Sequence, residues 1–182
     1  NNKTNIAMFE PFKKYSDLLK NKYKKNKKIE IYNYGIGNIN KVSNFFLAKD
    51  KKNSEAFSFK KMPYHSISTK VVLKKLDSLN FLKKKKISLI KIDVEQFEYE
   101  SIKGGVKLID KNRPIIFFET TNENISKIKN FFLKKKYTLF AYEFYIFKDN
   151  NFVFENPIKS WQKDNVIKSN IYSKKLNPLD NF

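Results

Sequence analysis

The sequence has no cysteine, one histidine (His65), one arginine and only four glycines. The lack of cysteine excludes disulfides, cysteine-ligated zinc and thiol nucleophiles, and it fits the reducing cytoplasm. The sequence gives no support for a metal site, because it has no paired histidines and no H-E-x-x-H motif. It also lacks G-x-G-x-x-G and P-loop motifs. No apolar run approaches the roughly 18 to 20 residues of a membrane span, and no signal peptide is recognisable, so a soluble cytoplasmic protein is expected.

The formal net charge of +20 comes almost entirely from lysine. Nucleic-acid recognition favours the planar, bidentate guanidinium of arginine, and Arg113 is the one arginine present. Lysine is also an ordinary way to solvate helix surfaces. We therefore expect no specific nucleic-acid partner, and we read the lysine as background composition; attraction to an acidic substrate or surface remains the alternative.

The 182 residues are enough for one compact domain, and the 16% aromatic content argues against disorder. We predict a single domain over 1–182, with its core at about 6–155 and a polar, weakly patterned tail at about 158–182. Apolar runs predict strands at Ile6–Phe9, Ile29–Tyr34, Val42–Leu47, Ala56–Phe59, Ile87–Val94 and Ile115–Phe118.

Helices are predicted between these strands by apolar residues at helical spacing. One follows Pro11, one spans Glu98–Asp110 with a break at Gly104 and Gly105, and one surrounds Ile128. The stretch from Val71 to Leu82 fits a strand entry followed by a short helix. Residues 61–69, with Pro63 and His65, are predicted to be a loop. A turn at Asp149–Asn151 predicts a terminal antiparallel hairpin.

Alternating strands and helices predict an α/β fold with an open, mostly parallel sheet. The Ile87–Val94 run is nearly all apolar, which predicts a central strand covered on both faces. Ligands of such sheets bind at the carboxyl ends of the strands. Three acidic strand ends therefore matter: Glu10, the pair Asp93 and Glu95, and Glu119.

Each of the acidic candidates has two interpretations. Glu10 could accept hydrogen bonds from both hydroxyls of a ribose, or it could cap the helix that begins near Phe12. Asp93 and Glu95 lie on the same side of an extended backbone, with Glu98 one turn later, so they form either an active-site edge or a favourable helix start. His65 is a candidate general base or an ordinary loop histidine.

Three stretches resemble the FkbM family of methyltransferases, in the order in which that family has them. They are AMFEPFKKYSDLLKNKYKKN, then ISLIKIDVEQFEYESIKGG, then RPIIFFE. The middle stretch resembles the family's D-V-E-G-x-E signature. The YGIGN turn and the KKLDSL stretch match in type, and the similarity covers roughly residues 6 to 155.

The resemblance implies a Rossmann-like class I methyltransferase that transfers the methyl group of S-adenosylmethionine to a sugar or other small-molecule hydroxyl. Glu10 and Pro11 would bind the ribose, and the turn containing Gly35 and Ile36 would lie near the adenine. Asp93, Glu95 and Glu98 would face the methyl donor or acceptor. The resemblance favours Glu95 or Asp93 as the base, ahead of His65.

Two departures from the family pattern affect this reading. Gln96 stands where the family usually has glycine, which places a side chain where close backbone approach was expected. The family's first strand and its glycine-rich loop have no counterpart before Ile6, so we expect an N-terminally truncated chain with two open sheet edges. A regulatory domain without catalysis is the alternative, and a basic nucleic-acid-binding protein is a further one.

Overall fold

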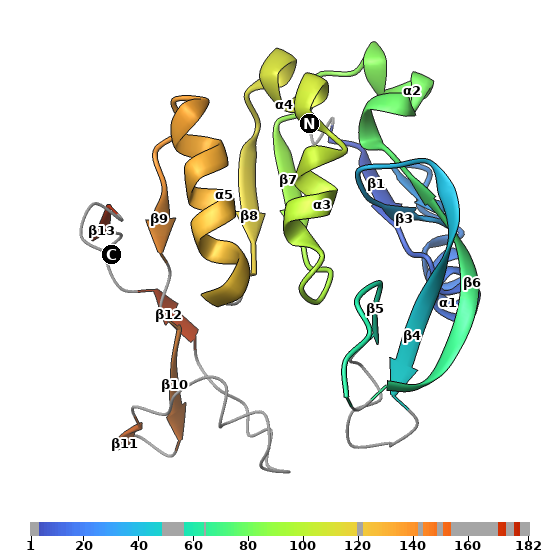
Figure 1. The fold of residues 1–182 in the computed structure, drawn as a ribbon, viewed down its shortest axis with the longest axis horizontal. Coiled ribbons are helices and arrows are strands. Elements are labelled where there is room, and N and C mark those ends of the chain that lie inside the picture. Colours follow the sequence, from blue (N-terminus) through green and yellow to red (C-terminus); the bar gives the residue numbers. More distant parts are fainter. Residues whose placement is uncertain are drawn as a thin grey trace. The chain divides into compact units, whose positions relative to one another are not determined.

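The computed structural model describes residues 4–48, 57–63, 65–119, 122–141, 144–148, 151–153, 171–173 and 177–178. The contacts divide the chain into two units, Asn1–Ile128 and Lys129–Phe182. All of the candidate site residues belong to the first unit, in which strands and helices alternate (Figure 1). A single domain over the whole chain stays a prediction.

The first unit begins with a β-α-β arrangement. Strand β1 (Ile6–Phe9) pairs in parallel with β2 (Ile29–Tyr32), and helix α1 (Lys13–Tyr23) connects them. Pro11 has no backbone N–H, so it cannot continue the ladder. These elements confirm the prediction, except that β2 ends two residues early, because the Tyr34 N–H turns back to donate to the Tyr32 carbonyl.

A second parallel pair carries the predicted signature segment. Strand β7 (Leu89–Ile92) pairs with β8 (Ile115–Phe118), and helices α3 (Glu98–Lys103) and α4 (Val106–Asn112) lie between them in the chain. The predicted helix break at Gly104 and Gly105 is confirmed. In Figure 1, β1, β7 and β8 run in the same direction, so their carboxyl ends lie toward one edge of the unit.

The prediction of β7 as a central strand covered on both faces is wrong for the described residues. There, β7 pairs with β8 and β1 pairs with β2, as separate sheets. The cross-strand partners Leu89 and Ile115 are 60% and 72% exposed. The apolar run predicted the strand correctly, but one of its faces is open in this chain. The fold is α/β with mixed sheets, and several of its pairings are antiparallel.

A buried cluster nevertheless joins the two parallel pairs. Leu79, Leu82 and Leu108 form its centre, and Phe9 of β1 and Ile90 of β7 pack against it. At roughly 1.5–3 kcal/mol for each large apolar side chain buried, this cluster fixes β1 and β7 within one core.

A four-stranded sheet with the order β3-β6-β4-β5 lies beside them. Its strands are β3 (Gly35–Ile36), β4 (Lys41–Ala48), β5 (Phe57–Ser58) and β6 (His65–Lys74). The predicted loop at 61–69 is wrong from His65 onward. The antiparallel ladder of β4 and β6 reaches from Lys41 opposite Leu73 to Ala48 opposite His65, and it extends β6 through polar residues.

The 3-10 helix η2 (Leu76–Ser78) and helix α2 (Asn80–Lys83) follow β6 and carry a long-range helix cap. Asp77 accepts hydrogen bonds from the backbone N–H groups of Lys107 (3.0 Å) and Leu108 (2.9 Å) in the first turn of α4. Gly105, at the N-cap position itself, has no side chain that could do this.

We therefore expect Asp77→Ala to lower the free energy of unfolding by about 1–2 kcal/mol, since two helix N–H groups lose their acceptor. Asp77→Asn retains one carbonyl oxygen and should lose about half as much. Urea denaturation of both variants measures the difference. A midpoint for Asp77→Ala equal to that of the natural sequence would show that Asp77 does not cap α4.

Among its described residues, the second unit contains the end of helix α5 (Asn122–Lys134) and the short strands β9 (Phe140–Ala141), β10 (Phe144–Lys148), β11 (Asn151–Val153), β12 (Ile171–Ser173) and β13 (Asn177–Pro178). The antiparallel pair of β10 and β11 confirms the predicted hairpin. Within the predicted tail, the described residues form β12, which pairs with β10, and β13, which pairs with β9. No helix of the described residues is long and apolar enough to span a bilayer.

Candidate active site

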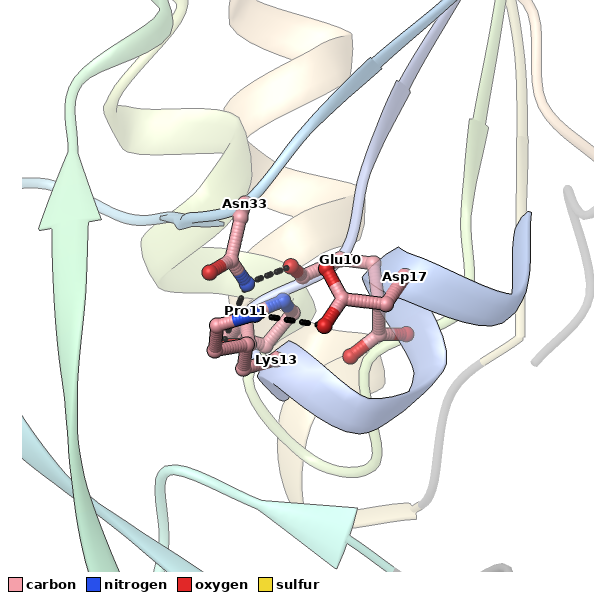
Figure 2. Close-up of polar contacts among 5 residues, drawn as sticks. All are labelled: Glu10, Pro11, Lys13, Asp17 and Asn33. Carbon is pink, nitrogen blue, oxygen red and sulfur yellow. Dashed lines mark hydrogen bonds and ion pairs between the residues drawn. The ribbon is translucent and has the colours of Figure 1, made fainter. Parts of the chain in front are cut away.

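The turn after β1 holds Glu10 in a defined position. The Phe12 N–H donates to Glu10 Oε1 at 2.7 Å. From the end of β2, Asn33 Nδ2 donates to the backbone carbonyls of Glu10 and Pro11, both at 3.0 Å. Figure 2 shows how Asn33 reaches across to this turn. The turn is therefore tied to both strands of the parallel pair.

The two interpretations of Glu10 are compatible in this geometry. Oε1 accepts the N–H of Phe12, which is the N-cap residue of α1, as the capping interpretation requires. Oε2 is the oxygen left for a ligand. Partial burial raises the pKa of the Glu10 carboxyl, and the Phe12 hydrogen bond lowers it by a smaller amount. A hydroxyl donor at Oε2 would offset this loss of hydration.

The turn after β7 carries Asp93, Glu95 and Glu98. Lys91 Nζ contacts Asp93 Oδ2 at 2.9 Å, in an exposed pair. Glu98, only 2% exposed, accepts the Gln96 N–H at 2.9 Å. Glu98 thus holds the turn from inside, whereas Glu95 is exposed along part of its side chain and its carboxyl group is partly desolvated next to the carboxylates of Asp93 and Glu119.

The backbone of this turn is strained. Glu95 and Gln96 have φ values of 44° and 67°, in the left-handed region that L-residues avoid. Each such residue costs about 1–2 kcal/mol unless its surroundings hold it. Gln96 therefore departs from the family's glycine at a position where the backbone conformation favours glycine.

Three neighbouring carboxylates act on Glu95 at this edge. The pKa of Glu95 is raised, chiefly by the loss of water around it and then by the negative charges of Glu119, Asp93 and Glu98. Glu119 directly follows β8, so the parallel pairing of β7 and β8 brings it to Asp93 and Glu95. The pKa of Glu98 is also raised by burial, although hydrogen bonds from the backbone and from Asn124 oppose the shift.

The remaining predicted site residues have structural contacts. Gly35 and Ile36 form β3, paired with Leu73 and Lys74 of β6, and Gly35 is buried. His65 is 6% exposed, its Nδ1 accepts the Met62 N–H at 3.0 Å, and its ring stacks on Phe46.

Sequence reasoning missed three residues that shape the site: Asn33, Ser58 and Asn124. Each donates to main-chain carbonyls of a strand-end turn, at Glu10 and Pro11, at Glu95 and at Gln96. A carbonyl acceptor leaves no residue-type signal, so their positions could not be found from spacing.

The model of the FkbM methyltransferase domain family matches residues 1–153. The solved structure of a methyltransferase FkbM from Methylobacillus flagellatus KT is similar in fold, with a TM-score of 0.54 at 15% identity. The similarity covers 76% of this chain but 32% of that one, so the chain spans about a third of its length. No curated protein matches the chain. Because this family model matches more than half of the chain, the chain belongs to the FkbM methyltransferase domain family.

Proposed function

We propose that this domain transfers a methyl group from S-adenosylmethionine to a hydroxyl group of a sugar or other small molecule. The observation that carries the proposal is the gathering of Asp93, Glu95, Glu98 and Glu119 at the ends of β7 and β8, with the pKa of Glu95 raised. A carboxylate with a raised pKa is suited to accept a proton near neutral pH.

Glu10 is the residue proposed to bind the methyl donor. Its Oε2 can accept hydrogen bonds from ribose hydroxyls, while the Phe12 N–H holds Oε1 and Asn33 holds the Glu10 backbone. When bound, S-adenosylmethionine supplies an electrophilic methyl group on a sulfonium sulfur. Gly35 and Ile36 remain a proposed adenine contact through their backbone, and His65 ranks below the carboxylates as a base because its Nδ1 is occupied.

Glu95 would accept the proton of the acceptor hydroxyl as the new oxygen–carbon bond forms and the sulfur–carbon bond breaks. Positioning of the two reactants supplies much of the rate in such a displacement, and proton removal supplies about 10²–10⁴-fold more. The negative field of Asp93, Glu95 and Glu119 disfavours phosphorylated or carboxylated acceptors. It suits hydroxyl donors, which points to a neutral glycan or similar molecule.

The open edges of β1 and β7 bear on the cofactor site. Both strands contact one core cluster, yet among the described residues neither pairs with the other. We infer that a further parallel strand, followed by the glycine-rich loop that the family resemblance implies, pairs between them in the natural protein.

Calorimetric titration with S-adenosylmethionine tests the proposal. The natural protein should bind, and Glu10→Gln should weaken the binding about 10–100-fold, because a charged hydrogen bond to ribose is lost. Glu30→Gln is the matched control, since it removes a carboxylate from the adjacent strand β2, and it should bind as tightly as the natural protein. A folded natural protein that gives no heat of binding would falsify the proposal.

A further inference from the structure

The turn between β7 and α3 has a strained backbone that the proposed chemistry does not explain. Two successive non-glycine residues, Glu95 and Gln96, are left-handed, and Glu95 is the proposed base. Such a conformation persists only where neighbouring groups determine it, and it commonly marks functional turns. The groups that hold it should therefore control where the Glu95 carboxylate points.

Ser58 holds the first residue of the turn. It lies in β5, is 1% exposed, and its Oγ donates to the Glu95 carbonyl at 2.6 Å. The same oxygen accepts the Lys60 N–H at 3.0 Å. A buried hydroxyl with both partners satisfied has a fixed direction, so Ser58 restrains the Glu95 peptide group.

Asn124 holds the second residue of the turn from α5. Its Nδ2 donates to the Gln96 carbonyl at 3.1 Å and, over a longer 3.4 Å, to Glu98 Oε2. Glu98 Oε1 in turn accepts the Gln96 N–H. Both polar groups of the Gln96 backbone are therefore bonded to side chains that are linked to each other.

We propose that Ser58 and Asn124 are positioning residues, which hold the strained Glu95–Gln96 turn so that the Glu95 carboxylate stays among the strand-end carboxylates. The inference rests on the proposed function for its chemical meaning. Neither residue is proposed to touch the reactants. Both act through the backbone of Glu95 and Gln96.

The charge around Glu95 provides a readout of its position. Asp93 at the end of β7, Glu119 at the end of β8 and Glu98 in α3 face it and raise its pKa. Two lysines lie near these groups: Lys91 Nζ contacts Asp93, and Lys60 Nζ donates to Gln96 Oε1 at 3.2 Å. A Glu95 carboxylate released from the turn moves away from its negative neighbours into water, and its pKa falls toward the ordinary value of 4.5.

The test is an NMR pH titration of the protein labelled with ¹³C at glutamate side chains, with the Glu95 signal assigned by Glu95→Gln. Ser58→Ala and Asn124→Ala should each lower the Glu95 pKa in the folded protein. Asn40→Ala is the matched control. It removes an asparagine that accepts the Lys75 N–H elsewhere in the same unit, and it should leave the Glu95 titration unchanged.

A second variant separates positioning from general damage. Glycine adopts the left-handed conformation without help, so adding Gln96→Gly to Asn124→Ala should restore much of the Glu95 pKa and of the folding. No restoration would overturn the proposal, as would an unchanged Glu95 titration in the folded single variants. If the variants show the expected pKa shifts but the natural protein gives no heat of binding with S-adenosylmethionine, the positioning roles stand and the proposed function fails.

Discussion

Replacing Glu95 with glutamine is expected to lower kcat about 10²–10⁴-fold while making the folded chain more stable at neutral pH. The two effects have one cause. Loss of water and the charges of Glu119, Asp93 and Glu98 make ionised Glu95 unfavourable in the folded state. Glutamine has a similar shape and carries no charge, so it relieves that cost and also removes the base.

The stability gain has a definite pH dependence. Folding raises the pKa of Glu95 above its ordinary value of 4.5, so the folded state binds the proton more tightly than the unfolded state does. The natural protein therefore loses stability as the pH rises from about 4.5 through the raised pKa. Denaturant titrations should show that Glu95→Gln is more stable than the natural protein at pH 7 and equally stable at pH 4.

Asp17→Asn is the control for these measurements, because it removes an equal charge from an exposed pair with Lys13. It should leave kcat unchanged, and its stability should change by no more than about 1 kcal/mol. A Glu95→Gln variant that keeps its full kcat would exclude Glu95 as the base. A variant that is less stable at pH 7 would contradict the electrostatic argument.

Replacing Gly104 with alanine is expected to destabilise the fold by about 3 kcal/mol, near the upper end for overpacking. A Cβ atom at Gly104 would lie 1.9 Å from the Gly37 carbonyl oxygen and 2.7 Å from its carbon. These are backbone atoms, so relief requires α3 to move away from the turn after β3. The same junction is bonded by Ser101 Oγ, which donates to the Ile36 carbonyl at 2.9 Å.

Gly105→Ala provides a matched control in the next residue. Its Cβ atom would meet only the Leu76 side chain, at 3.1 Å or more, and a side chain can shift. Neither glycine has a positive φ, so the two variants differ in space and not in backbone conformation. Thermal unfolding should show Gly104→Ala lower by roughly 6–12 °C, with Gly105→Ala changed by a few degrees at most. Equal melting temperatures would contradict the close contact.

The sequence alone predicts the parallel pairs well, because their information is local. Ile6–Phe9 and Ile115–Phe118 are apolar runs that end at Glu10 and Glu119, and the structure places strands at those bounds. The same reasoning misses β6 from His65 to Thr69, because the polar residues of this segment form a strand by pairing with β4. A distant partner strand leaves no pattern within the segment that it orders.

The candidate site was predictable in its carboxylates and not in its geometry. Asp93, Glu95 and Glu98 follow from the end of an apolar strand, but nothing in their spacing indicates two left-handed residues. The sequence did show that Gln96 stands where the family usually has glycine. It did not show that the Glu95–Gln96 backbone is strained, or that Ser58 of β5 and Asn124 of α5 hydrogen-bond to it.

The central claim is that the carboxylates after β1 and after β7 serve one bound molecule. It is tested most directly by following the ¹³C side-chain signals of Glu10 and Glu95 while S-adenosylmethionine is added to the natural protein. The account predicts that both signals shift and that both titrate with a single dissociation constant. Movement of one signal without the other, or of neither at saturating S-adenosylmethionine, would contradict it.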